Sequence, residues 1–487
     1  MRTKILILFL SSSIAAFSQG INNVWLLGYD CCSTDFASMT VDFSQGGFNP
    51  VIVSRSINFS ETNGSISDSL GNLLFYSNGV YVANANNDTM LNGSGINPGS
   101  FVTAHARYGL TIPQANLVIP IPGQTSKYYL FHETSDDPGL TYATYFLYYS
   151  IIDMRLDGGL GAVVQKNTVL LHDTLVGGRL TATRHANGRD WWLVAHKDFS
   201  GKMYKFLITA AGIQGPWVQD LLTYRDSYFG QAVFSPQGDK FAYYEAFGDL
   251  DIWDFDRCTG DFSNQIHVDI NDSAAAGGAA FSSTGRFLYL SSIKYMYQFD
   301  MQATNIPGSQ TTVGVYDHFV SGLPSSFYLS QLAPDGKIYT NCGNSTKVFH
   351  VINTPDSLAC DFCQHCISLP GYSAFTIPNY PNYFLGALAG SVCDSLTSSI
   401  QDGAFTGVVL SLFPNPVKDI AYIRGMNEKI ISVELINSIG EIIQQPFHYV
   451  NSDEYIELNI SLLKGGIYFV RLTGKKGSLG VKMVKVE

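Results

Sequence analysis

Short runs of aromatic and branched apolar residues, each preceded by a polar turn with glycine, recur along most of the chain. The turn glycines stand 47 to 65 residues apart, at Gly71, Gly123, Gly188, Gly238, Gly285 and Gly336. Glycine permits the positive φ of a tight turn, and the following runs are too short for helices and too rich in Tyr, Phe and Leu for loops. Alternation over 251–256 and 295–300 predicts further, half-buried strands. Several strands in each period of about 50 residues are typical of propeller blades.

The same pattern predicts how such a ring closes. Strands are expected at 24–27 and 39–43, and again at 383–385. Pairing the first and last strands in one blade would remove the sheet edges and give seven blades, with six or eight as alternatives. A string of β-sandwiches is the rival fold, but the spacing is short and no linkers separate the units.

The first residues have the pattern of an export signal. Arg2 and Lys4 precede the apolar run 5–10, and Ala16-Phe17-Ser18 places small residues at a cleavage site. We predict a secretory signal peptide at 1–18, because the run is too short to span a membrane. No later apolar segment has the length of a span, so we expect a secreted or surface-held protein without a transmembrane segment.

Composition changes this picture in two respects. The 487 residues have a net charge of −11 and 46% apolar residues, which argues against nucleic-acid binding and excludes a disordered chain. Export makes disulfides the expected state of most of the eight cysteines, although the sequence leaves their pairing open. The cluster Cys360, Cys363, His365 and Cys366 also has zinc-ligand residue types, but zinc sites usually need two separated pairs.

A shift of composition marks a second domain. Residues 395–407 are rich in Ser, Thr, Gly and Asp, which predicts a linker between a β-propeller at 19–394 and a module at 408–487. This module is expected to be a small Ig-like β-sandwich, with strands at 421–424, 431–436, 455–458, 467–472 and 481–486. The predicted fold class is all-β.

Segments of the module resemble a known family, the type IX secretion sorting domain of Bacteroidetes. The resemblance rests on 413–416, 433–440, 463–472 and 482–486, with key positions at Pro414, Asn415, Pro416, Gly440, Gly466 and Tyr468. It implies passage through the outer membrane by the type IX secretion machinery. It also implies removal of the module, with the cargo released or attached to surface lipopolysaccharide. No catalytic residue belongs to that domain.

The preceding region resembles a group of large secreted propeller-like proteins of the same bacteria, on 65–79, 153–161, 255–260 and 378–386. This second resemblance implies a fold and a location but no activity.

Candidate binding residues lie beside the expected blade strands. Rings and imidazoles that face a central mouth would bind a sugar by stacking and hydrogen bonding. The candidates are His132, His185, Trp191, Trp192 and His196. The alternative is that the tryptophans pack between blades and the histidines bond to backbone.

The sequence contains no recognisable catalytic motif. His132-Glu133 lacks the second histidine of a zinc protease, and neither a Gly-x-Ser-x-Gly elbow nor a phosphate-binding glycine loop occurs. Carboxylates near strand ends are Glu133, Glu245, Asp249, Asp251 and Asp254, and solvated turns are the simpler interpretation. Asp249-Leu-Asp251 and Asp269-Ile-Asn-Asp272 offer oxygens to calcium but lack the spacing of a calcium loop, so we predict no cofactor, with calcium as the alternative.

These observations favour a secreted or surface propeller used for binding or adhesion, with a glycan or an envelope protein as ligand. The alternative is an extracellular hydrolase or lyase that acts on polysaccharide or peptide at the mouth, and a structural surface component is a third reading. Converging acidic groups in the mouth would favour the enzyme, whereas an uncharged aromatic mouth would favour binding.

Overall fold

The computed structural model describes the chain in two compact units, Met1–Ser391 and Val392–Glu487. The described residues are 20–30, 34–135, 143–225, 229–393, 411–415, 417–424, 432–437, 442–443, 448–451, 455–474 and 477–486. The predicted signal peptide and linker lie outside them. We call the two parts the N-terminal unit and the C-terminal unit and describe each separately.

Seven antiparallel sheets form the described part of the N-terminal unit, and six of them contain four strands in chain order. The first sheet contains only β1 (Val24–Leu27), β2 (Met39–Asp42) and β3 (Pro50–Ile52). The second contains β4 (Gly64–Ser67), β5 (Leu73–Ser77), β6 (Tyr81–Asn84) and β7 (Thr89–Ser94). The third contains β8 (Asn116–Pro120), β9 (Lys127–Thr134), β10 (Ala143–Asp153) and β11 (Ala162–Val176), and a bridge between Leu91 and Ala162 joins it to the second.

The other four sheets repeat this order. The fourth sheet contains β12 (Thr181–Arg184), β13 (Trp191–His196), β14 (Ser200–Thr209) and β15 (Gly212–Arg225), and the fifth contains β16 (Gly230–Phe234), β17 (Lys240–Glu245), β18 (Asp249–Phe255) and β19 (Phe262–Val268). The sixth contains β20 (Gly277–Phe281), β21 (Phe287–Ser292), β22 (Tyr295–Asp300) and β23 (Thr311–Val315). The seventh contains β26 (Phe327–Leu332), β27 (Ile338–Cys342), β28 (Thr346–Ile352) and β29 (Phe362–Ser373). A small hairpin of β24 (Val320–Ser321) and β25 (Leu323–Pro324) precedes the last sheet. The one α-helix of the described residues is α1 (Ser100–His105), between the second and third sheets.

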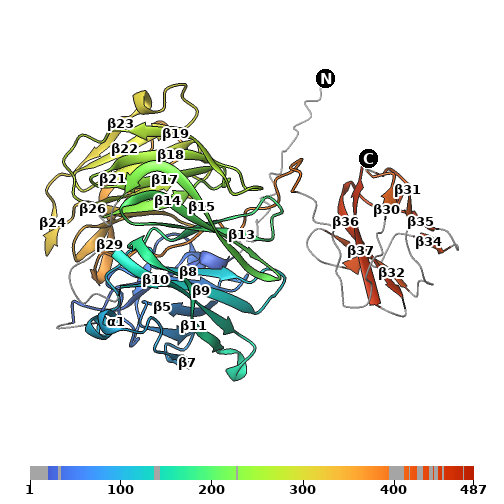
Figure 1. Ribbon diagram of the computed structural model, residues 1–487, viewed down its shortest axis with the longest axis horizontal. Helices are drawn as coiled ribbons and strands as arrows, with labels where there is room; N and C mark the ends of the chain where they lie inside the picture. Colours follow the sequence, from blue (N-terminus) through green and yellow to red (C-terminus); the bar gives the residue numbers. More distant parts are fainter. Residues whose placement is uncertain are drawn as a thin grey trace, which may run out of the picture. The chain divides into compact units, whose positions relative to one another are not determined.

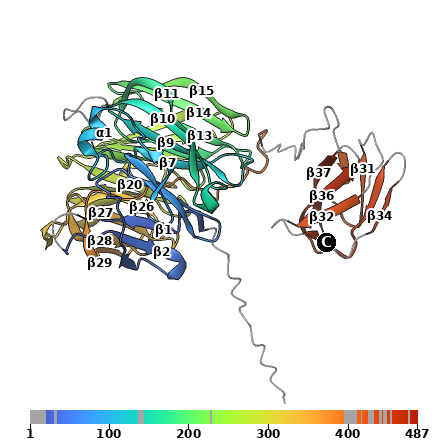
Figure 2. The same ribbon diagram turned by 90° about the horizontal axis from the view of Figure 1, so that it is seen from below.

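The sheets follow one another around a ring. The first strands of neighbouring sheets lie side by side, as for β1 and β4, β16 and β20, and β20 and β26. The outer strand β29 of the last sheet lies beside β3 of the first, so the ring returns to its start (Figures 1 and 2). This arrangement is a seven-bladed β-propeller, as the sequence predicts.

The six predicted turn glycines occupy one equivalent position. Each lies in the turn between the first and second strands of its sheet, and its φ lies between 70° and 92°. Because side chains are disfavoured at such φ values, glycine is the residue that lets the inner strand reverse tightly here. All six turns therefore lie at the same end of the ring, which we call the glycine-turn end.

The prediction of a closing strand at 383–385 is wrong. The first sheet takes all three of its strands from 24–52, and residues 374–386, which we call the strap, form no strand. Pro378 and Pro381 prevent a continuous ladder along the strap, because proline has no backbone N–H to donate.

Side chains of the strap close the ring instead. The Asn379 amide donates to the carbonyl oxygens of Asn116 (3.1 Å) and Leu180 (2.9 Å), at the third and fourth sheets. The Tyr380 hydroxyl donates to the carbonyl of Val24 in β1 at 2.8 Å. The strap thus links the first sheet to later sheets through side chains rather than through a shared β-ladder.

We expect the Asn379→Ala variant to lower the free energy of unfolding of the propeller by about 2–3 kcal/mol, because two carbonyls lose a buried donor. Asn382→Ala is the control, since Asn382 donates one part-buried bond to Pro236 and accepts one exposed bond from the N–H of Phe384, and should cost about 1 kcal/mol or less. Urea unfolding followed by tryptophan fluorescence measures both, because all five tryptophans lie between positions 25 and 253. Equal costs would contradict the closing role of Asn379.

The C-terminal unit contains two four-stranded sheets. One is ordered β30 (Ser411–Phe413), β31 (Ile420–Arg424), β35 (Ile456–Asn459) and β34 (His448–Asn451), and the other β33 (Ile442–Ile443), β32 (Ser432–Asn437), β36 (Gly466–Gly474) and β37 (Gly477–Lys485). Side chains from both sheets, including Ile423, Leu458, Leu435 and Val470, form one buried cluster. Two sheets that share one core are the predicted β-sandwich.

Candidate functional site

A cavity of about 360 Å³ lies at the glycine-turn end of the propeller ring. The last residues of the inner strands β16, β20 and β26 form much of its wall, and the strap contributes another side. Small-molecule sites have volumes of about 300–1,000 Å³. The central mouth predicted from the sequence is therefore present, and it is large enough for a small ligand.

The lining of this cavity is polar but uncharged. Its polar groups are those of Asn22, Gln114, Thr181, Ser283, Ser330, Gln331, Asn379 and Asn382, and its aromatic rings those of Phe234, Phe281, Tyr380 and Phe384. Among the described lining residues there is no Asp, Glu, His, Lys, Arg or Cys. Phe384 is 42% exposed, and Oδ1 of Asn22 is buried without a hydrogen-bond partner. The lining offers hydrogen bonds and ring faces but no strong acid or base.

The predicted tryptophans do not reach this cavity. Trp191 and Trp192 are buried on β13, the second strand of the fourth sheet. Trp191 packs against Tyr383 of the strap with the Arg184 guanidinium over its ring, whereas Trp192 donates from Nε1 to the carbonyl of Arg257 at 2.9 Å. Both rings therefore pack between sheets, which is the alternative that the sequence had left open.

The three predicted histidines are also interior. His132 bonds to Asn97 (2.6 Å) and to Ser150 (2.9 Å), and burial lowers its pKa to about 3. His196 lies beside the Tyr243 hydroxyl, and burial lowers its pKa to about 3 as well. The ring of His185 bonds to the carbonyl of Cys258 at 3.1 Å. None of the five predicted residues lines the cavity, and the structure does not bring them together there.

The predicted carboxylates lie elsewhere, and most are not solvated turn residues. Asp254 pairs with Lys240 at 2.7 Å and is part-exposed, as expected. Asp251 is instead 0% exposed, so β18 is not the half-buried strand that its alternation predicts. Propeller strands are covered on both faces by neighbouring blades, which explains the difference.

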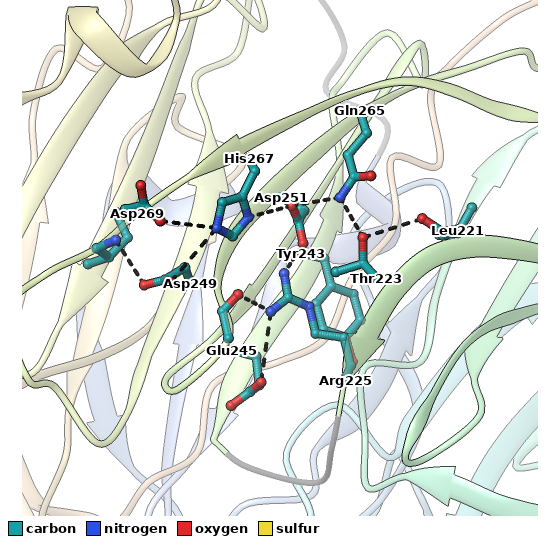
Figure 3. A network of polar contacts seen from close by, with 12 residues as sticks. Leu221, Thr223, Arg225, Tyr243, Glu245, Asp249, Asp251, Gln265, His267 and Asp269 are labelled. Carbon is teal, nitrogen blue, oxygen red and sulfur yellow. Dashed lines mark hydrogen bonds and ion pairs between the residues drawn. The ribbon is translucent and has the colours of Figure 1, made fainter.

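Burial of Asp251 is accompanied by a polar network within the fourth and fifth sheets (Figure 3). Arg225, at the end of β15, donates to the Asp251 carboxylate and to the carbonyl of Gly248. Its guanidinium is also 3.9 Å from the Glu245 carboxylate, and its carbon lies 5.8 Å from the centre of the Tyr243 ring. Burial lowers the pKa of Arg225 and raises that of Tyr243. A Cβ at Gly248 would displace the guanidinium from this position, so the absence of a side chain there lets Arg225 reach its partners.

One edge of this network reaches the surface at His267. Its Nδ1 lies 2.8 Å from the Asp251 carboxylate, while its Nε2 lies 3.3 Å from Asp269 and 3.9 Å from Asp249. Figure 3 shows the imidazole between these two sides. The sequence analysis selected the aspartates as possible calcium ligands but missed His267.

The four aspartates of that calcium alternative do not converge. Asp251 is occupied by Arg225, Gln265 and His267, whereas Asp272 accepts bonds from Ser292 and Tyr297. Only Asp249 and Asp269 come together, with His267 as the third member of the group. Two carboxylates and an imidazole are too few oxygens for calcium, which takes 6–8.

The cysteines follow the disulfide prediction rather than the zinc alternative. Cys363 and Cys366 form a disulfide on β29, and Cys258 and Cys393 are disulfide-bonded too. Cys342 and Cys360 are free and buried, and Cys31 and Cys32 lie outside the described residues. With two of its three thiols oxidised, the 360–366 cluster cannot be the zinc site considered above.

In the C-terminal unit, two residues of the predicted sorting motif have defined bonds. The side chain of Asn415 accepts from the backbone N–H of Val484 in β37 at 2.8 Å, and the Tyr468 hydroxyl donates to the carbonyl of Lys464 at 3.0 Å. Pro414 lies beside Asn415, and Gly466 begins β36. Pro416 and Gly440 lie outside the described residues.

Residues 411–486 match the family described as the secretion system C-terminal sorting domain. The C-terminal unit is therefore a type IX sorting domain, and fold and tail together define a secreted β-propeller protein of the type IX secretion system. The protein is accordingly secreted or held at the cell surface. None of the helices in the described part of the chain is long and apolar enough to cross a membrane.

The propeller fold has solved counterparts with little sequence similarity. A protein from Lactobacillus plantarum is 13% identical, with 73% of this chain and 98% of that chain covered and a TM-score of 0.44. A putative 6-phosphogluconolactonase from Bacteroides fragilis is 12% identical, with 74% and 98% covered and a TM-score of 0.42. The β-propeller domain of Cps50 (Swd1) from Myceliophteria thermophila is 10% identical, with 65% and 89% covered and a TM-score of 0.34. The likeness concerns the fold alone, and no curated protein matches the chain.

Proposed function

We propose that the propeller is an extracellular binding module whose cavity at the glycine-turn end takes an uncharged polar ligand, with a neutral glycan as the favoured class. The observation that carries this proposal is the absence of any ionisable acid or base, other than a tyrosine phenol, among the described residues of the lining. Such a lining has nothing to neutralise a charged ligand, and desolvating an unpaired charge is costly.

The groups that are present suit a sugar. A sugar ring presents hydroxyls that both donate and accept, together with apolar C–H faces. The amides of Gln114, Asn379 and Asn382 already bond within the protein and hold the wall in place. The unpartnered Oδ1 of Asn22 is an acceptor without a protein donor, and it can take a sugar hydroxyl. The exposed ring of Phe384 offers an apolar face for stacking.

The hydrolase alternative receives less support from this cavity. Glycoside hydrolysis needs two carboxyl groups on either side of the scissile bond. Of the carboxylates singled out above, Glu245 and Asp251 are buried beside Arg225, and Asp254 pairs with Lys240. None of them contributes to the cavity lining.

Binding is tested with the full chain on a panel of neutral and anionic polysaccharides, with retention and product release recorded together. We expect retention on one or more neutral polysaccharides, no products, and a roughly tenfold weaker affinity for Phe384→Ala, which corresponds to about 1.4 kcal/mol of lost stacking.

Phe247→Ala is the matched control, because Phe247 is 63% exposed and lies in the turn between β17 and β18, at the opposite end of the ring. Its affinity should equal that of the unmodified protein. Product release, or retention on anionic polymers alone, would refute the proposal, as would an equal loss of affinity in both variants.

A further inference from the structure

A second group of side chains, at the opposite end of the ring from the cavity, has the features of a metal site. Asp249 begins β18, while His267 and Asp269 stand at the end of the neighbouring strand β19. Potential ligand atoms of all three lie within 4.8 Å of one another. The group combines one nitrogen and two oxygen ligands from two adjacent strand ends.

The imidazole is oriented as a metal ligand requires. Nδ1 of His267 lies 2.8 Å from the Asp251 carboxylate, which is 0% exposed and is itself held by Arg225. Ligand histidines almost always donate their second ring N–H to a carboxylate or carbonyl in this way. A proton on Nδ1 leaves the lone pair of Nε2 directed toward Asp249 and Asp269.

The distances fit a small divalent ion. Two ligands that are each about 2.1 Å from a tetrahedral metal lie roughly 3.4 Å apart. Nε2 of His267 lies 3.3 Å from Asp269 and 3.9 Å from Asp249. Asp269 is therefore already at the spacing of two ligands, and a shift of about 0.5 Å by the Asp249 carboxylate, which is 31% exposed, brings it to the same spacing.

Several carboxylates lie around the sheet that holds the three residues. Tyr244 of β17 is buried on the other face of this sheet, with Leu250 and Val268. The negative charges of Asp272, Asp249 and Glu245 all act on this phenol. Carboxylates thus outnumber cations in this region, where Arg225 is the one fixed positive charge of the network in Figure 3.

We propose that Asp249, His267 and Asp269 bind a divalent transition metal of the Zn²⁺ class, with a remaining coordination position left for water. An imidazole nitrogen with two carboxylates suits zinc and its neighbours in the transition series, whereas calcium needs more oxygens than the group supplies. The ion ties the start of β18 to the end of β19 and balances the excess of carboxylates. This site is independent of the binding function proposed for the cavity.

The test uses the full chain, stripped of metal with a chelator and titrated with Zn²⁺, Ca²⁺ or Mg²⁺ by calorimetry. We expect one equivalent of Zn²⁺ to bind, with Ca²⁺ and Mg²⁺ at least tenfold weaker. Co²⁺ in place of Zn²⁺ should give the visible absorption of a low-coordinate site. His267→Gln is expected to weaken Zn²⁺ binding by a hundredfold or more and to remove the cobalt bands.

His365→Gln is the matched control. His365 forms an exposed pair with Asp317 at 2.9 Å, so it has the same chemistry without a third ligand. Its binding curve should match that of the unmodified chain. If His267→Gln fails to fold by tryptophan fluorescence, Asp269→Asn replaces it, because that side chain is mostly exposed. No zinc binding, preference for Ca²⁺, or equal binding in both histidine variants would overturn the proposal.

Discussion

Replacing Arg225 with methionine is expected to lower the free energy of unfolding of the propeller by about 3–5 kcal/mol. Arg225 is the cation that faces the 0% exposed carboxylate of Asp251, and Glu245 lies 3.9 Å away. The variant leaves these carboxylates inside the protein without that partner, and an uncompensated buried charge is among the costliest defects that one substitution can make. Urea unfolding of the full chain, followed by tryptophan fluorescence, measures the loss.

Two further variants decide whether the unpaired charge or the changed packing causes the loss of stability in Arg225→Met. Arg225→Met combined with Asp251→Leu should recover much of the stability, because both charges leave together. Lys347→Met removes the cation of a surface pair with Asp35, in which both side chains are part-exposed, and should cost at most about 1 kcal/mol. If the double variant is as unstable as Arg225→Met alone, the loss comes from packing.

Acid is expected to unfold the propeller abruptly below about pH 4.5. Burial lowers the pKa of His132, His196 and His350 to about 3, against about 6.5 in an unfolded chain. The unfolded state therefore binds more protons between pH 6.5 and pH 3, so stability falls as the pH falls through that window. Three such groups together give a slope of up to about 4 kcal/mol per pH unit.

Two buried carboxyls oppose this loss in the upper half of the window. Burial raises the pKa of Glu61 to about 7 and that of Glu133 well above its usual value. The folded state holds these protons above about pH 4.5 while the unfolded state has released them, so acidification toward pH 4.5 favours folding at these sites. Below pH 4.5 the two glutamates are protonated in the folded and the unfolded state alike, so they no longer oppose the loss of stability that the histidines cause.

The predicted pH dependence is tested by measuring the free energy of unfolding at a series of pH values from 7 to 3. The curve should be shallow above pH 4.5 and steep below it. His132→Gln should reduce the slope just below pH 4.5 by up to about one third, because one of three histidines is gone. Nearer pH 3, aspartates whose pKa is lowered, such as Asp153 and Asp261, add to the slope. Asn382→Ala serves as control, since it removes no titratable group and should leave the slope unchanged. A slope that His132→Gln does not alter would contradict the assignment.

Much of the fold was predictable because its signals are local. Each turn glycine is read directly from the sequence, and β22 has the predicted bounds. The absence of a closing strand was not predictable from apolar character alone, since Tyr383 and Phe384 look like strand residues. The prolines at 378 and 381 were the available signal, because they argue against a ladder.

The sites were harder to predict because burial between blades depends on the whole ring. Trp192 and His196 gave the pattern of a binding face, yet neighbouring sheets cover them. The pairing of Arg225 with Asp251 crosses from one blade to the next, and no sequence spacing reports it. His267 did leave a signal, because residues 265 and 267 alternate along β19 opposite Asp251 of β18, and Asp269 continues this alternation just after β19 ends.

Closure by the strap has a consequence for export. Tyr380 meets Val24 across 356 positions of sequence and Asn379 meets Asn116 across 263, so these bonds form only when nearly the whole propeller chain is available. Contacts so distant in sequence delay folding. We expect the ring to stay open, and the chain competent for translocation, until the strap arrives. The sorting domain begins 25 residues after the strap ends, so the bonds that close the ring use no residue of that domain.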